Sequence, residues 1–252
     1  MKYIPVASLS AIVDLIVAIG VAAIIFSRRR LMGKSDALVP NFMRAFIFMG
    51  CGFFLFSLAG IVIFDLRLIE VSYIFGNAFF LIAMSFLIFV PARIFSMEDR
   101  LTKVMSWVLV VSAIFHIIFN LIFLKPAEAV YFKPFIDWRD SAPPALQLIV
   151  WALVAATLLG ITLLFIIHGW YHNDRLIRKR SRIYACGFFL DFTGWLSIFL
   201  FAISATKNKI ILVGGGALGC VLISLGMIML LVATISKDSP VPEKQSPIKG
   251  SD

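Results

Sequence analysis

The chain has 252 residues, of which 61% are hydrophobic and 15% charged, and its formal net charge is +9. Soluble domains contain about 45–50% apolar and about 25% charged residues. The composition therefore excludes a soluble globular protein and indicates an integral membrane protein. Lys and Arg occupy short gaps between long apolar runs, a pattern that encodes membrane topology, so we expect no nucleic-acid partner.

Seven apolar runs reach the length of about 20 residues that a membrane-spanning helix requires. They cover about 6–26, 45–64, 72–94, 104–124, 145–167, 183–204 and 210–235. These runs predict an all-α integral membrane protein, with a seven-helix transmembrane bundle over residues 1–236. Residues 237–252 are rich in Pro and Ser and too polar to fold, which predicts a disordered cytoplasmic tail.

The distribution of basic residues predicts the orientation of the bundle. The connections after the first, third and fifth runs, together with the tail, carry 16 Lys and Arg residues, and the opposite side carries 7. Basic residues are enriched on the cytoplasmic side of membrane proteins. We therefore expect the N-terminus outside, the C-terminus in the cytoplasm and a location in the cell (inner) membrane.

The pentapeptide CGFFL occurs twice, at 51–55 and at 186–190. Aligning the two copies places Phe56 opposite Asp191, and a similar alignment of the third and seventh runs places Gly76 opposite Gly215. Three helices, one linking helix and three more helices would form a 3+1+3 parallel repeat, an arrangement known among membrane transporters. The alternative is a chance match between two sequences rich in Phe, Leu and Gly.

Small residues lie at helical spacing in the last two runs. Gly187 and Gly194 share a face of the sixth run with Asp191, and Gly215 and Gly219 form a GxxxG pair in the seventh. Small residues at this spacing let helix backbones approach each other closely. We interpret these glycines as helix-packing residues.

Several polar residues fall well inside the spans, where polar groups usually face the bundle interior and often mark a pathway or proton relay. The candidate ligand- or proton-pathway residues are Asp191, Asp14, Asn77, His116, Asn120 and Trp195. We expect the carboxyl groups to be protonated or paired with a donor. The alternative for Asp191 is a purely structural hydrogen bond between two helices.

Helix rise gives the expected depth of these groups. Asp191 lies about 12 Å from the inner end of the sixth predicted run, and Asp14 lies at a similar distance from the outer end of the first. His116 falls in roughly the same layer as Asp14. These depths allow one polar layer near the middle of the membrane.

The longest outer connection, residues 125–144, alternates aromatic and charged residues, among them Tyr131, Trp138 and Lys133. Aromatic rings favour the interface between headgroups and acyl chains. The segment is therefore either a short interfacial element or a lid over a site in the bundle.

The sequence carries no phosphate loop, HExxH or GxSxG motif, so we expect neither an enzyme nor a bound metal or cofactor. Three functions fit what remains. The first is a carrier or channel for a small solute or ion, and the second is a seven-helix sensor that signals to a separate cytoplasmic partner. The third is an accessory subunit of a membrane complex, and either a homo-oligomer or another membrane partner fits the glycine faces.

Overall fold

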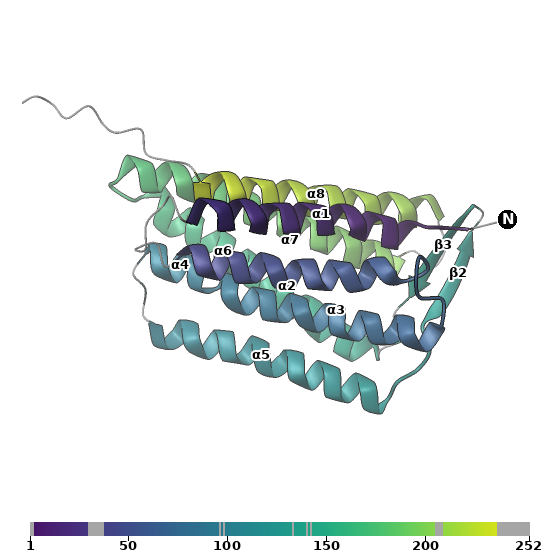
Figure 1. Ribbon diagram of the computed structural model, residues 1–252. Coiled ribbons are helices and arrows are strands. Elements are labelled where there is room, and N and C mark those ends of the chain that lie inside the picture. The colour runs from purple at the N-terminus through teal and green to yellow at the C-terminus, as the bar shows by residue number, and fades with distance from the viewer. Residues whose placement is uncertain are drawn as a thin grey trace, which may run out of the picture.

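The computed structural model describes residues 3–29, 38–95, 97, 99–132, 134–139, 141, 143–204 and 209–235. This part of the chain contains seven helices long and apolar enough to span a membrane (Figure 1). The expected all-α, seven-helix membrane protein is therefore confirmed. The predicted tail at 237–252 lies outside the described residues.

The helices are longer than the apolar runs at several ends. Their bounds are α1 Val6–Arg29, α2 Leu38–Leu58, α3 Leu66–Leu87, α4 Phe89–Ile94, α5 Asp99–Ile122, α6 Pro144–Trp170, α7 Arg175–Ser204 and α8 Lys209–Ile235. Among the larger differences, α2 begins before the predicted 45 and ends before the predicted 64, and α7 begins well before 183. The basic residues that open α7 are good helix formers, so the helix continues beyond the apolar run.

Local chemistry explains several helix ends. Asp65 caps α3, because its carboxylate accepts hydrogen bonds from the backbone N–H groups of Arg67 and Leu68. Gly60 follows α2 with a φ of 71°, a conformation that glycine adopts without strain. Pro91 lacks the N–H that would bond to the Leu87 carbonyl, and the helix is interrupted between α3 and α4 within one continuous span.

Six of the spanning helices form a closed ring. Each of α1, α2, α3, α6, α7 and α8 packs against the next, and α8 returns to α1, with the α7–α8 contact the most extensive. Helix α5 lies outside this ring, where it packs mainly against α3 (Figure 1). The fold thus brings the first and last helices of the chain side by side.

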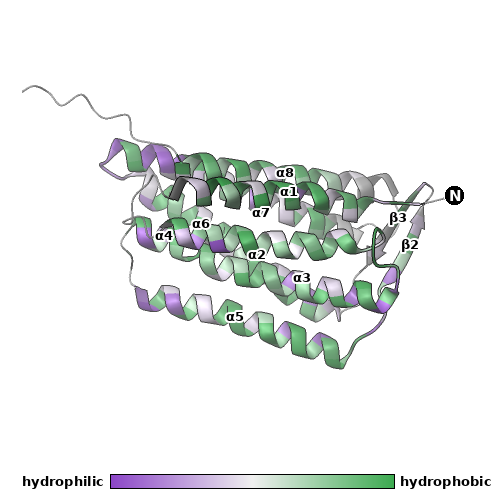
Figure 2. Cartoon of the chain, viewed as in Figure 1, coloured by the Kyte–Doolittle hydropathy of each residue, from purple (hydrophilic) through white to green (hydrophobic). Residues whose placement is uncertain are grey.

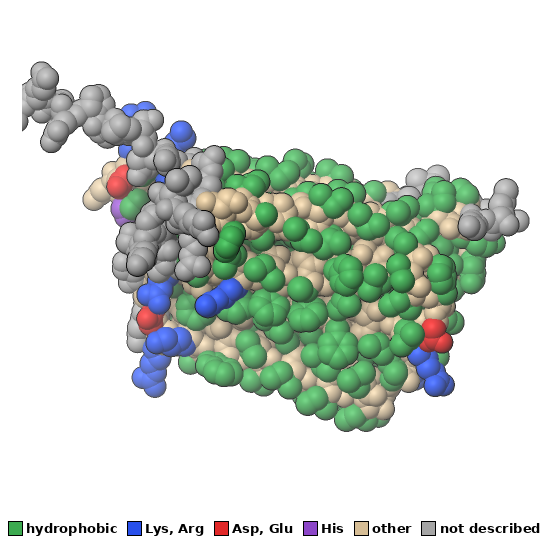
Figure 3. Space-filling model, in the orientation of Figure 1, with side chains coloured by type: hydrophobic (Ala, Val, Ile, Leu, Met, Phe, Trp, Pro, Cys, Tyr) green, Lys and Arg blue, Asp and Glu red, His purple; other side chains and the backbone are tan. Residues whose placement is uncertain are grey.

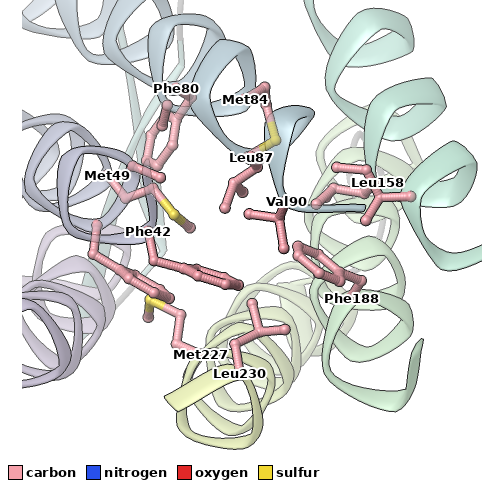
Figure 4. Packing of buried hydrophobic residues seen from close by; sticks show 14 of the residues in the cluster. Phe42, Met49, Phe80, Met84, Leu87, Val90, Leu158, Phe188, Met227 and Leu230 are labelled. Carbon is pink, nitrogen blue, oxygen red and sulfur yellow. The ribbon is translucent and has the colours of Figure 1, made fainter. Parts of the chain in front are cut away.

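Large apolar side chains fill the centre of the ring. Phe42 and Met49 of α2 meet Met84 of α3, Phe188 of α7 and Met227 of α8 in one cluster (Figure 4). All five side chains are almost fully buried. The middle of the bundle therefore has an apolar filling, unlike the polar lining of an open pore.

Hydrophobic side chains also cover the outside of the bundle (Figure 3). Hydrophobic residues predominate along the helices, and hydrophilic residues gather towards their ends (Figure 2). Most of the Lys and Arg side chains visible in Figure 3 lie at the end opposite the β-strands, which we call the basic end. This distribution matches a protein surrounded by hydrocarbon between two polar interfaces.

A three-stranded sheet closes the other end, which we call the sheet end. The strands β2 (Glu128–Phe132) and β3 (Phe135–Arg139) form an antiparallel hairpin, and β1 (Ile4–Pro5) pairs in parallel with β3. The order is β1-β3-β2. The aromatic connection at 125–144 thus contains a hairpin, an element that the sequence reasoning did not anticipate.

The hairpin is fixed to the helices below it. The Trp138 indole covers Gly60, where an added Cβ would lie 2.4 Å from the indole nitrogen. The backbone N–H of Ser141 donates a hydrogen bond of 2.9 Å to the buried carboxylate of Glu70 on α3. These contacts connect β3 and its continuation to the turn after α2 and to the start of α3.

Candidate functional site

The backbones of α7 and α8 touch where both helices carry glycine. A Cβ added to Gly194 of α7 would lie 2.7 Å from the carbonyl oxygen of Gly219 on α8. A Cβ on Gly226 of α8 would lie 2.7 Å from the carbonyl oxygen of Gly187 on α7. Of the four glycines interpreted as packing residues, Gly187, Gly194 and Gly219 therefore lie in this contact. The fourth, Gly215, is buried on α8.

The carboxyl group of Asp191 fills the space beside Gly226. A Cβ on Gly226 would lie only 2.1 Å from Asp191 Oδ1, so no larger residue fits opposite this carboxyl group. Asp191 is 1% exposed and lies near the middle of the 30-residue helix α7. Asp191 is farther from the start of its helix than the predicted distance of about 12 Å, because α7 begins at Arg175 and not at 183. Neither carboxyl oxygen has a hydrogen-bond partner among the described residues.

Asp14 approaches the same region from α1. It is fully buried, and the hydroxyl of Ser224 on α8 donates a hydrogen bond of 2.6 Å to its Oδ1. The thiol of Cys220, one turn before Ser224, lies beside Asp14, and Ser10 lies beside that thiol. Asp14 Oδ2 has no partner among the described residues.

The two carboxyl groups are close enough to interact electrostatically. We call Asp14, Asp191, Ser10, Cys220 and Ser224 the acidic cluster. None of the Lys, Arg or His side chains that the structure describes forms an ion pair with either aspartate. Two neighbouring carboxylates repel each other strongly in a medium of low dielectric constant. The cluster can lower this repulsion by binding a proton or a small cation.

Trp195 lies one turn after Asp191 on α7. Its ring meets Phe80 of α3 edge-on at a centroid distance of 4.6 Å and Trp151 of α6 at 5.2 Å. Its indole N–H is buried without a hydrogen-bond partner among the described residues. Helix α7 thus carries, one turn apart, a buried N–H donor on Trp195 and a buried carboxyl acceptor on Asp191, and neither has a hydrogen-bond partner among the described residues.

His116 and Asn120 form a second polar group on α5. Asn120 Nδ2 lies 3.1 Å from His116 Nδ1 and donates to the His116 carbonyl oxygen at 2.8 Å. Both side chains are buried, and α5 packs mainly against α3. Asn77 is buried on α3 itself. The structure therefore separates these residues from the acidic cluster, which lies among α1, α7 and α8.

The α2–α3 contact has the same local geometry as the contact between α7 and α8. A Cβ on Gly52 would lie 3.1 Å from the Gly76 carbonyl oxygen, and one on Gly76 would lie 2.4 Å from the Phe56 ring. Gly187, Asp191 and Gly226 repeat this arrangement, with 3.2 Å between a Gly187 Cβ and the Gly226 carbonyl oxygen. Phe56 and Asp191 thus occupy equivalent places, and Gly76 corresponds to Gly226 instead of the expected Gly215.

Sequence reasoning missed the polar partners of Asp14. Ser10 and Asp14 are four residues apart, as are Cys220 and Ser224, so each pair shares one helix face. These two four-residue spacings could have indicated a polar face on the first span and another on the last, but nothing in the sequence showed that the two helix faces are in contact. Glu70 was also missed, because the third span was expected to begin at 72.

No protein-family model matches this chain, and no curated protein matches it either. The described residues contain no group of three or more His, Cys, Asp or Glu side chains arranged to hold a metal ion.

Proposed function

We propose that this polytopic membrane protein is a carrier for a small solute or ion and that Asp14 and Asp191 form its proton- or cation-binding site. One observation carries the proposal. Asp14 Oδ2, both oxygens of Asp191 and the Trp195 indole nitrogen are buried without hydrogen-bond partners among the described residues. Buried polar atoms in folded proteins nearly always have partners, so we assign these atoms to a transported ion or solute.

The cost of burying the two aspartates supports a functional role. A charged side chain near the bilayer centre costs about 2.5–3.5 kcal/mol on insertion scales. Phe56 shows that the equivalent place between α2 and α3 accommodates an apolar ring. A carboxyl group at Asp191 is therefore unnecessary for packing, which favours a chemical task.

The apolar filling of the ring favours a carrier over an open channel. The described core between α2, α3, α6, α7 and α8 consists of hydrophobic side chains, among them Phe, Met, Leu and Val (Figure 4). A solute that reaches the acidic cluster must therefore displace helices. The cluster joins α1 to α7 and α8, so relative movement of these helices would open the site.

The test is proton movement in proteoliposomes. Purified protein is reconstituted with a pH-sensitive dye inside, and a panel of small cations, amino acids and sugars is added outside in turn. We expect one class of solute to change the internal pH with wild-type protein and to have no effect with Asp191→Asn. Ser197→Ala is the matched control, because the one hydrogen bond of the Ser197 hydroxyl among the described residues goes to a carbonyl oxygen of its own helix.

Unchanged proton movement in Asp191→Asn would remove this carboxyl group from the mechanism. Solute flux that is retained while proton movement is lost would mean that Asp191 couples protons without binding the solute. A flux defect of equal size in Ser197→Ala would indicate a general effect of altering α7.

The ordered sheet end favours a seven-helix sensor as the second candidate. The first strand and the hairpin form one sheet that is anchored to Gly60 and Glu70. A ligand bound there could shift α1, which follows β1 directly. A solute that raises the melting temperature but produces no flux, together with a copurifying cytoplasmic protein, would support this alternative.

A further inference from the structure

A groove lies between α6 and α7 towards the basic end of the bundle. Its volume is about 240 Å³. Thr162, Ile166 and Trp170 line it from α6, and Arg182, Ala185 and Phe189 line it from α7. Apart from Arg182 and Thr162, these lining side chains are aliphatic or aromatic.

The groove opens on the outer surface of the bundle. Ile166 is 42% exposed, Phe189 50% and Trp170 52%. All three lie on helices that are long and apolar enough to span a membrane, with Trp170 at the end of its span, so we expect Ile166 and Phe189 to face lipid acyl chains. The groove is thus accessible from the bilayer without any movement of the helices.

Arg182 stands at the end of the groove that is nearer the polar surface. Its guanidinium carbon lies 4.6 Å from the centroid of the Trp170 ring, in a cation–π contact. Tryptophan favours the level of the lipid headgroups. Among the described residues, no carboxylate lies within ion-pair distance of Arg182.

The surroundings of Arg182 are strongly basic. The first turns of α7 also carry Arg175, Arg178 and Lys179. The acidic residue closest to Arg182 in sequence, Asp174, accepts a hydrogen bond of 2.7 Å from the N–H of Leu176 and so caps α7. This end of the groove therefore attracts anions.

We propose that the α6–α7 groove binds an anionic glycerophospholipid. The Arg182 guanidinium donates hydrogen bonds to the lipid phosphate, and one acyl chain lies in the apolar part of the groove against Ile166 and Phe189. Basic pockets between membrane helices on the cytoplasmic side bind anionic headgroups in this way. An apolar groove with one cation at the headgroup level matches a lipid better than a soluble anion, which would leave the apolar part unfilled.

Native mass spectrometry of the full-length protein in detergent tests this proposal. The probes are phosphatidylglycerol, phosphatidylcholine and inorganic phosphate, each added alone. We expect bound phosphatidylglycerol to exceed bound phosphatidylcholine, and Arg182→Gln to weaken phosphatidylglycerol binding about fivefold. Arg182→Lys should restore part of the binding, because lysine also binds phosphate as a point charge.

Arg100→Gln is the matched control. Arg100 is exposed at the start of α5, so its loss removes the same charge from the basic end away from the groove. A second variant, Ala185→Leu, fills the groove and should weaken binding while Arg182 remains. Melting temperatures measured without added lipid establish that each variant is folded.

Three results would overturn the proposal. The first is equal binding of phosphatidylglycerol to wild-type protein and Arg182→Gln. The second is an equal loss of binding in Arg100→Gln, which would indicate a diffuse surface charge effect. The third is displacement of the lipid by inorganic phosphate at similar concentrations, which would identify a site for soluble anions.

Discussion

The carboxyl group of Asp191 fits into the bundle because residue 226 has no side chain. Gly226 lies directly beside Asp191 Oδ1, and the oxygens of Asp191 have no partner among the described residues. Asp14, on α1, accepts a hydrogen bond from Ser224 and lies beside Cys220. The two aspartates therefore differ: Asp14 is fixed by a hydrogen bond, and Asp191 is held mainly by packing.

Asp191→Asn should leave the bundle as stable as the wild type. Asparagine has the same shape as aspartate, and the wild-type carboxyl group makes no hydrogen bond to the described residues that would be lost. We expect the free energy of unfolding in mixed micelles to change by less than about 1 kcal/mol. A decrease of about 2 kcal/mol or more would show that Asp191 is a structural residue after all.

Ser224→Ala should destabilise the protein by about 0.6 kcal/mol and by no more than about 1.7 kcal/mol, the average and the maximum measured for interhelical hydrogen bonds in a membrane protein. The variant removes the 2.6 Å bond to Asp14. Unfolding free energies of Ser224→Ala, Asp14→Ala and the double variant give the coupling energy, because each single variant removes one partner of the bond. Ser197→Ala serves as control, and additive effects of Ser224→Ala and Asp14→Ala would contradict the bond.

At the scale of helices, glycine determines which pairs approach most closely. The α2–α3 and α7–α8 contacts use glycines in the same way, with Phe56 in one and Asp191 in the other. This shared geometry is what a duplicated three-helix unit would produce, and the 3+1+3 repeat stays a prediction. The contact also corrects the alignment of the third and seventh spans, since an apolar sequence rich in small residues permits several registers.

Gly226→Ala should be among the most damaging small substitutions in α8. The new Cβ would clash with Asp191 and with the Gly187 carbonyl oxygen, so the helices must separate. Overpacking of this kind costs about 1–3 kcal/mol. Gly216→Ala on the same helix meets no atom within 4 Å and should be neutral or stabilising by up to about 1 kcal/mol.

Unfolding in mixed micelles compares the two alanine variants directly. Equal stability of Gly226→Ala and Gly216→Ala would mean that α7 and α8 tolerate a wider separation. Oxidation or labelling of Cys220 gives an independent check, because separated helices expose this residue to reagents.

At the scale of the whole molecule, most charged side chains on the face shown in Figure 3 lie near the two ends, and an apolar surface lies between them. The basic end carries the starts of α5 and α7, and the sheet end carries the hairpin. Basic residues favour the cytoplasmic side. We therefore predict that the sheet end faces outwards.

Cysteine labelling tests this orientation. A membrane-impermeant maleimide should label Glu128→Cys in intact cells, and it should label Asn173→Cys only after lysis. Both positions are exposed, at the sheet end and between α6 and α7 respectively. The wild-type protein is the blank, since its three cysteines lie within the spans. The reverse labelling pattern would invert the predicted topology.

The sequence by itself determined the number and the type of the spans, because a hydrocarbon environment requires long apolar helices. It also singled out Asp14 and Asp191, since ionisable residues are rare in such helices. Only the tertiary structure brought these residues together around Ser224 and Cys220 and set His116 and Asn120 apart. Helix neighbours depend on side-chain fit between faces, and apolar faces look alike in sequence. The hairpin could not be predicted for a related reason, since its pairing with β1 joins segments that lie far apart along the chain.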